Sequence, residues 1–138
     1  MTPEDQWNSF ELAVREAGHW TRAAAEPWGR AWLASDPTSD ERSSTSVRVP
    51  YGMVAQVQQM KRTASLPYEP ERLSMPVLVA VGEWDQVTPL SQALALFHRL
   101  PGASKRLVVV GQAGHRMHLE KTRGTLHGET TAFLGQLP

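Results

Sequence analysis

The fold of this chain is decided by two stretches of its sequence, Val77-Leu78-Val79-Ala80-Val81-Gly82-Glu83-Trp84-Asp85 and Leu107-Val108-Val109-Val110-Gly111-Gln112-Ala113-Gly114-His115. Each begins as an apolar run, typical of a strand buried on both faces of a sheet, and each ends on one ionisable side chain. The helix-like residues between them predict a β-α-β crossover, and therefore two parallel neighbouring strands. Both loops would emerge at the carboxyl edge, where open α/β sheets place their sites. Because neighbouring strands lie about 5 Å apart, we expect Asp85 to come within reach of His115.

The residues around these strands predict two helices, which complete a β-α-β-α second half. Thr88 as N-cap and Pro89 in the first turn would start the first helix, and Pro101-Gly102 would stop it. A last helix would cover the sheet with an apolar face. That face would consist of Leu126, Phe133, Leu134 and Leu137.

The first half of the chain reads as helices separated by a polar loop. A first amphipathic helix through Trp7, Phe10, Val14 and Ala17 would end at Gly18. A second helix over residues 22–34 would be kinked or divided by Pro27 and Gly29. Residues 35–46, rich in Ser, Thr, Asp and Arg, predict an exposed loop or hinge, and residues 51–62 predict another helix before a proline-bounded extended connection.

Composition limits the function classes. A chain of 138 residues with 41% hydrophobic residues is one ordinary soluble domain, and its 14 basic residues balance its 14 acidic ones. This balance argues against nucleic acid or an anionic membrane surface as a partner. The sequence has no cysteine, no secretory signal pattern at its start and no apolar run of the ~20 residues that a bilayer requires. We therefore expect a cytoplasmic protein without a cofactor.

The chemistry suggested by Asp85 and His115 is acid-base catalysis. A carboxylate beside a histidine fixes the tautomer of the imidazole and stabilises the imidazolium that forms when the ring takes a proton from a nucleophile. The acid precedes the histidine, with room for one helix and one strand between them, which is the order found in α/β hydrolases. Asp85 and His115 are therefore the candidate catalytic residues.

Residues 75–89 resemble the penultimate core strand and acid loop of α/β-hydrolase-fold proteins, with the acid at Asp85. Residues 111–120 resemble the segment after the last core strand, with the base at His115. The resemblance is specific over residues 75–137, and residues 35–39 and 46–52 look like cap sequence of esterase-like and aminopeptidase-like members. It implies a partial α/β-hydrolase fold. A cap-like helical region would cover residues 1–70, with a polar loop near 35–50, and residues 71–138 would form the C-terminal part of the core.

The sequence departs from that family at the nucleophile. It contains no Gly-x-Ser-x-Gly elbow, and Ser39, Ser43, Ser44 and Ser46 sit in a polar loop without flanking glycines. We therefore expect a C-terminal portion of a serine-type hydrolase of small ester or amide substrates, which is inactive when isolated. The competing hypothesis is a noncatalytic binding or assembly module derived from a hydrolase tail. A two-stranded sheet leaves edges that another copy or a complementing chain would cover, unless the chain does not fold independently at all.

Each candidate residue also has a simpler interpretation. Asp85 could only cap the helix that follows it, and His115 could be an ordinary loop histidine. A metal site joining His115 to His118 and Glu120 is disfavoured, because the spacing is not that of a helical His-Glu-x-x-His pair. We expect His118, near the start of the final helix, either to pack in the core or to support the residues of the site. Glu83 should point away from Asp85. The tryptophans are expected in the core rather than around a substrate: Trp7, Trp20, Trp28, Trp32 and Trp84.

Overall fold

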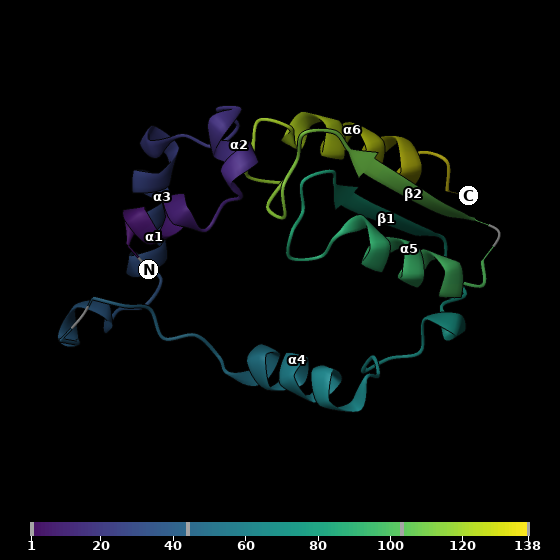
Figure 1. Cartoon of the computed structure of the whole chain (residues 1–138), viewed down its shortest axis with the longest axis horizontal. Helices are drawn as coiled ribbons and strands as arrows, with labels where there is room; N and C mark the ends of the chain where they lie inside the picture. Colours follow the sequence, from purple (N-terminus) through teal and green to yellow (C-terminus); the bar gives the residue numbers. More distant parts are fainter. Residues whose placement is uncertain (1, 44, 103, 138) are drawn as a thin grey trace.

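Two parallel strands with helices on both sides form the centre of the computed structural model, which describes residues 2–43, 45–102 and 104–137 (Figure 1). Strand β1 is Val77–Gly82 and strand β2 is Lys105–Val110. They pair in register from Val77 opposite Lys105 to Gly82 opposite Val110. The predicted pair of parallel neighbours is therefore confirmed, and both strands end at the same edge of the sheet.

Helix α5, Leu90–Arg99, connects the strands, and helix α6, Arg123–Leu134, follows β2. Figure 1 shows them on opposite sides of the strands, and both contact β1 and β2. This arrangement explains why β1, and β2 from Leu107 onward, are continuously apolar rather than alternating. Below α6, a small core of Val110, Ala113 and Met117 is packed against Val108 and Leu126. Of the four residues predicted for the inner face of this helix, Leu134 is largely exposed, and Leu137 lies beyond the end of α6 and is partly exposed.

The start of α5 corrects one prediction. Thr88 is not the N-cap, because the helix begins at Leu90 and Pro89 occupies the cap position without a side-chain hydrogen bond. The hydroxyl of Thr88 instead donates a hydrogen bond to Asp85. A threonine before a helix can accept a hydrogen bond from the first helical N–H groups or donate one to a neighbouring loop residue. Here Thr88 donates to Asp85 in the loop.

The N-terminal region also differs from the predicted single helix. It forms two short helices, α1 over Pro3–Asn8 and α2 over Leu12–Glu16. The break lies at residues 9–11, where the Ser9 hydroxyl caps the Gln6 carbonyl and Glu11 has extended backbone angles. Gly18 ends α2 with φ of 66°, in the left-handed region where glycine is preferred. The apolar residues do follow helical spacing, but a turn at residues 9–11 divides them between two helices.

Helix α3, Arg22–Ala34, is one continuous helix with Pro27 inside it, so the predicted division is wrong. Gly29 lies against Pro3 of α1, and a Cβ built on Gly29 would come within 2.8 Å of the Pro3 nitrogen. Glycine at this position thus allows α1 and α3 to pack closely. The core beneath them is formed by Phe10, Val14, Trp20 and Ala25, against which Trp7, Trp28, Trp84 and Leu119 pack.

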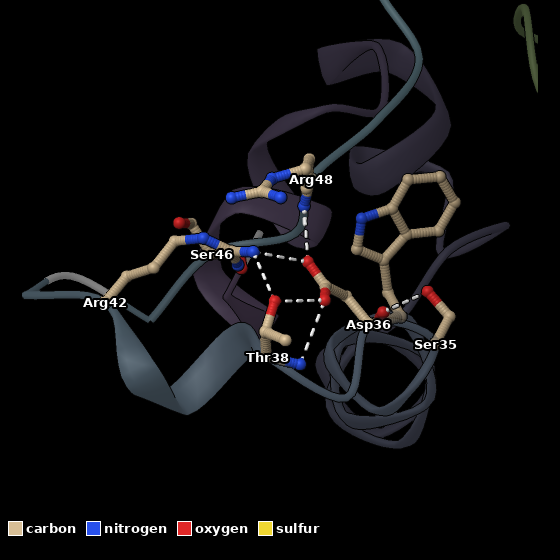
Figure 2. Close-up of polar contacts among 7 residues, drawn as sticks. Ser35, Asp36, Thr38, Arg42, Ser46 and Arg48 are labelled. Atoms are coloured by element: carbon tan, nitrogen blue, oxygen red, sulfur yellow. Dashed lines mark hydrogen bonds and ion pairs between the residues drawn. The ribbon is translucent and has the colours of Figure 1, made fainter.

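Residues 35–43 and 45–48 form a hydrogen-bonded loop with a short 3₁₀ helix, η1, over Ser39–Glu41 (Figure 2). Asp36 is its centre, because its carboxylate accepts hydrogen bonds from the Arg48 N–H, from Thr38 and from the Arg42 guanidinium. The Arg48 N–H, followed by Thr38 and Arg42, holds the pKa of Asp36 well below its usual range. Ser39, expected in an exposed loop, is buried.

Helix α4, Gly52–Thr63, matches its prediction to within one residue at each end. It lies apart from the sheet in Figure 1, and of its side chains only Met60 is partly buried. Its apolar residues Met53, Val54 and Val57 are exposed. A short 3₁₀ helix, η2, over Pro70–Arg72 then leads into β1. Within the described ranges, no helix combines the length and hydropathy needed to cross a bilayer.

Candidate active site

Asp85 lies in the loop that leaves the carboxyl end of β1, and its side chain is only 3% exposed. One carboxylate oxygen, Oδ1, accepts the N–H groups of Val87 and Thr88 at 2.9 and 2.8 Å. The other, Oδ2, accepts the Thr88 hydroxyl at 2.7 Å and lies 3.0 Å from Nδ1 of His115. Four donors therefore converge on two oxygens, which matches the acceptor capacity of an ionised carboxylate.

The ionisation of Asp85 follows from these contacts. Burial alone raises the pKa of Asp85, but the hydrogen bonds from Thr88 and His115 outweigh it and hold the pKa below its ordinary value. Asp85 closes the turn before α5 and also contacts the histidine, so its geometry is compatible with both the capping and the catalytic interpretation. Oδ1 serves only the turn, whereas Oδ2 is shared between the Thr88 hydroxyl and His115 Nδ1.

His115 follows the carboxyl end of β2, and its side chain is 39% exposed. Its Nδ1 faces Asp85 Oδ2 at 3.0 Å and the Thr88 hydroxyl oxygen at 3.3 Å. Because the Thr88 hydroxyl proton is directed to Asp85, Nδ1 must carry the proton that it donates to the carboxylate. Among the described residues the ring contacts no other hydrogen-bonding partner, so Nε2 keeps its lone pair available. This is the tautomer that a general base requires.

The loop between β2 and His115 is held by groups from distant parts of the chain. Gln112 adopts φ of 57°, an uncommon left-handed conformation for a residue that is not glycine. Its N–H donates to Glu83 Oε2 at 2.8 Å, and its carbonyl accepts from His19 Nδ1 at 3.0 Å. Glu83 thus points away from Asp85, as expected, and supports the turn that carries the chain toward His115.

Two further carboxylates hold the next N–H groups of this loop. Glu120 Oε2 accepts the Gly114 N–H at 2.9 Å, and Glu11 Oε1 accepts the His115 N–H at 2.9 Å. Glu120 is fully buried, and its second oxygen has no hydrogen-bond partner, as is also true of Glu11 Oε2. Burial and the neighbouring charge of Glu11 raise the pKa of Glu120, against the opposing effects of Gly114, His19 and Thr122. Glu120 therefore stays protonated to a higher pH than the same carboxyl group does in water.

Close backbone packing brings the two loops together. A Cβ built on Gly82 would lie 2.3 Å from the Ala113 carbonyl oxygen and 2.5 Å from that of Gly114. The same carbonyl of Ala113 accepts the Trp84 N–H at 2.9 Å. Glycine at the end of β1 is therefore required for the approach that brings Asp85 to His115.

The other predicted residues fall into two groups. Trp84 stacks on His19, with ring centroids 6.0 Å apart, and packs against the N-terminal core, as does Trp7. His118 is exposed, and together with Trp28, Trp32 and His115 it lines a cavity. No cluster of three or more His, Asp or Glu side chains suited to a metal occurs in the part of the chain that the structure describes.

Sequence reasoning missed the roles of Glu11, Thr88 and Glu120. Glu120 was considered only as a metal ligand and Thr88 only as a helix cap. A signal was present for Glu120, because an acidic residue a few positions after a loop histidine is placed to accept a loop N–H. Glu11 gave no local signal, since its partner is 104 residues away.

The sequence model of the family described as serine aminopeptidase, S33, matches residues 9–122. The chain is also similar to the crystal structure of a His-tagged serine hydrolase involved in carbazole degradation, the CarC enzyme. That match has a TM-score of 0.48 and 23% identity, and it covers 61% of this chain and 33% of the other. The chain thus spans about a third of the length of that structure. So distant a likeness supports no statement on activity.

No curated protein sequence matches this chain. The family match nevertheless extends over most of the chain, from the residue after α1 to the residue before α6, and includes both Asp85 and His115. The two parallel strands, with helices on both faces, agree with a partial form of the corresponding fold. The chain therefore belongs to the serine aminopeptidase family of α/β hydrolases.

Proposed function

We propose that this chain supplies the acid and the base of a serine-type hydrolase that cleaves small esters or amides. The observation that supports the proposal is the 3.0 Å contact between Asp85 and His115 at the shared edge of two parallel strands. Asp85 stays ionised, and Nδ1 of His115 carries the proton between them. Nε2 is left as the proton acceptor.

In the proposed reaction, Nε2 of His115 accepts the proton of a nucleophilic hydroxyl as its oxygen attacks the substrate carbonyl. The imidazolium that forms is stabilised by Asp85, and it then donates the same proton to the leaving alcohol or amine. Water repeats the cycle on the acyl intermediate and returns the nucleophile to its hydroxyl form. Asp85 keeps its charge throughout, because all four of its acceptor positions are already used.

The nucleophile belongs, in this proposal, to a part of the active enzyme outside these 138 residues, which contain no Gly-x-Ser-x-Gly sequence. In the described part of the chain, no serine forms a hydrogen bond with His115. General acid-base groups without a positioned nucleophile and an oxyanion hole lose most of the rate advantage. We therefore expect the isolated chain to hydrolyse p-nitrophenyl acetate no faster than free imidazole does.

The test is hydrolysis of p-nitrophenyl acetate by the chain alone and by the chain fused to an upstream segment that contains a Gly-x-Ser-x-Gly elbow. The fusion should turn over the ester, and His115→Ala should abolish this activity. His127→Ala is the matched control, because that histidine is exposed on α6 and takes no part in the Asp85–His115 contact. Turnover by the isolated chain that disappears in His115→Ala would show that the nucleophile lies within it. An inactive, folded fusion would count against the hydrolase assignment.

A second candidate function, a binding or assembly module, is favoured by the exposed apolar surface on one side of the sheet. A cavity of about 540 Å³ lies over β1 and α5, and Met60, Leu66 and Tyr68 line its far side. The β1 edge beside it pairs with no strand among the described residues. A second copy or a complementing chain would cover this surface. Analytical ultracentrifugation distinguishes the two, because a stable monomer at micromolar concentration contradicts an obligate partner.

A further inference from the structure

A second cavity, of about 260 Å³, lies directly beside His115, between α3 and the loop that follows the histidine. Its apolar walls are the indole rings of Trp28 and Trp32, whose centroids are 6.4 Å apart, together with Leu119. Trp28 also packs on the N-terminal core, which fixes that wall. The cavity is therefore not a gap at a mobile edge but a space bounded by packed aromatic side chains.

The polar side of this cavity carries positive charge. Arg116 lines it together with His115 and His118, and none of the lining residues is acidic. The Arg116 guanidinium donates hydrogen bonds to the Ser9 hydroxyl and to Gln6 Oε1, and it lies 5.3 Å from the Phe10 ring centroid. Within the described residues it forms no ion pair with a carboxylate.

The geometry of Arg116 leaves it suited to an anion. Both hydrogen bonds to protein use Nη1, so the rest of the planar donor fork is available. A guanidinium binds a carboxylate with two parallel, charge-assisted hydrogen bonds. Stacked against one aromatic ring and tethered to two polar side chains, it is held in place before a ligand arrives.

The volume of the cavity limits the size of the ligand. An apolar cavity of about 150 Å³ holds one benzene molecule, whereas sites for drug-sized ligands begin near 300 Å³. A cavity of about 260 Å³ therefore has room for one aromatic ring and a short substituent.

We propose that this cavity binds a single-ring aromatic group that carries a carboxylate, with the ring packed against Trp28 and Trp32 and the anion on Arg116. Binding of this ligand does not depend on the proposed hydrolase function. Only the identification of the ligand with part of the substrate rests on that function. His115 lines the same cavity, so a bound ring would sit beside the proposed base. The substrate class is then an ester or amide in which one of the two parts is a small aromatic ring that carries a free carboxylate besides the bond to be cleaved.

Binding of benzoate to the full chain tests the proposal without any turnover. We expect saturable shifts in a ¹H–¹⁵N NMR titration, largest at the indole N–H signals of Trp28 and Trp32, with the indole of Trp7 as the internal control. Benzamide has the same ring without the charge, and cyclohexanecarboxylate has the charge without the aromatic ring. Each should bind about tenfold more weakly than benzoate, because each lacks one of the two recognised features.

Two variants separate the contributions. Arg116→Met should weaken benzoate about tenfold and leave benzamide unchanged, and Arg116→Lys should fall between, since it keeps the charge without the fork. Well-dispersed spectra show that the variants are folded, and the comparison among ligands on the unaltered chain does not depend on them.

Equal affinities for benzoate and benzamide, or shifts centred on Trp7, would overturn the assignment. If benzoate does not bind as expected but the fusion hydrolyses the ester in a His115-dependent way, the ligand assignment is wrong and the proposed function stands. If benzoate binds as expected but the fusion is inactive, the ligand assignment stands and the proposed function is wrong.

Discussion

Gly114→Ala tests how the loop that carries His115 is packed. A Cβ built at this position lies 2.4 Å from Glu11 Oε2, 2.9 Å from Glu11 Cδ and 2.8 Å from Val14 Cγ2, closer than real Cβ contacts allow. Val14 is fully buried, and Glu11 can retreat only by giving up its hydrogen bond to the His115 N–H. Overpacking of this kind costs about 1–3 kcal/mol, and the lost charge-assisted hydrogen bond is of similar size.

We therefore expect Gly114→Ala to lower the free energy of unfolding of the full chain by about 2 kcal/mol, measured by urea denaturation followed by circular dichroism. Gly128→Ala is the matched control, because a Cβ there meets nothing within 4 Å in the middle of α6, and it should stabilise by about 0.5–1 kcal/mol. In a Glu11→Ala background the cost at Gly114 should fall, since the two sites share one contact. A Gly114→Ala variant as stable as the unaltered chain would show that the loop is not packed in this way.

Three other substitutions address the site itself. Asp85→Asn should shift the His115 ring away from the Nδ1-protonated tautomer, visible in ring ¹⁵N shifts, and lower the activity of the fusion by ~10³–10⁴-fold; an unchanged tautomer would contradict the assignment. Thr88→Val should destabilise by about 1–2 kcal/mol in urea unfolding, whereas Thr88→Ser, which keeps the hydroxyl, should not. The pKa of Glu120 is raised in the folded state, so stability falls as pH rises from 4.5 through that raised value. Glu120→Gln should remove this loss, and its urea midpoint should exceed that of the unaltered chain increasingly toward neutral pH; a difference independent of pH would refute it.

The two strands, and the contact between Asp85 and His115, could be predicted because the sequence signals for them are local. Six consecutive apolar or small residues in β1, and the end of β2 at Val110, are properties of short segments. Once the strands are parallel neighbours, the side chains that follow them must meet at one edge. Asp85 and His115 were therefore found without knowing anything about the rest of the chain. The division at residue 70 into a cap-like region and a core stays a prediction.

The errors arose where a side chain had to choose between a local and a distant partner. Thr88 has the sequence context of a helix cap, but its hydroxyl serves Asp85 and the helix starts later. Glu11 sits within an unbroken helical periodicity, yet the chain turns there and its carboxylate binds the His115 N–H. Periodicity reports which face of a segment is apolar. It does not report that a polar residue is needed elsewhere in the fold.

Two separate groups of residues position His115. Its ring is oriented by Asp85 and Thr88 from the loop after β1. Its backbone is held by carboxylates, since Glu83, Glu120 and Glu11 accept the N–H groups of three of the four residues 112–115. These carboxylates come from three different parts of the chain, and each bond is charge-assisted. Removing Asp85 therefore frees the ring without releasing the loop, whereas removing Glu11 shifts the loop and carries the ring with it. Orientation and placement of the imidazole are independent properties of this fold.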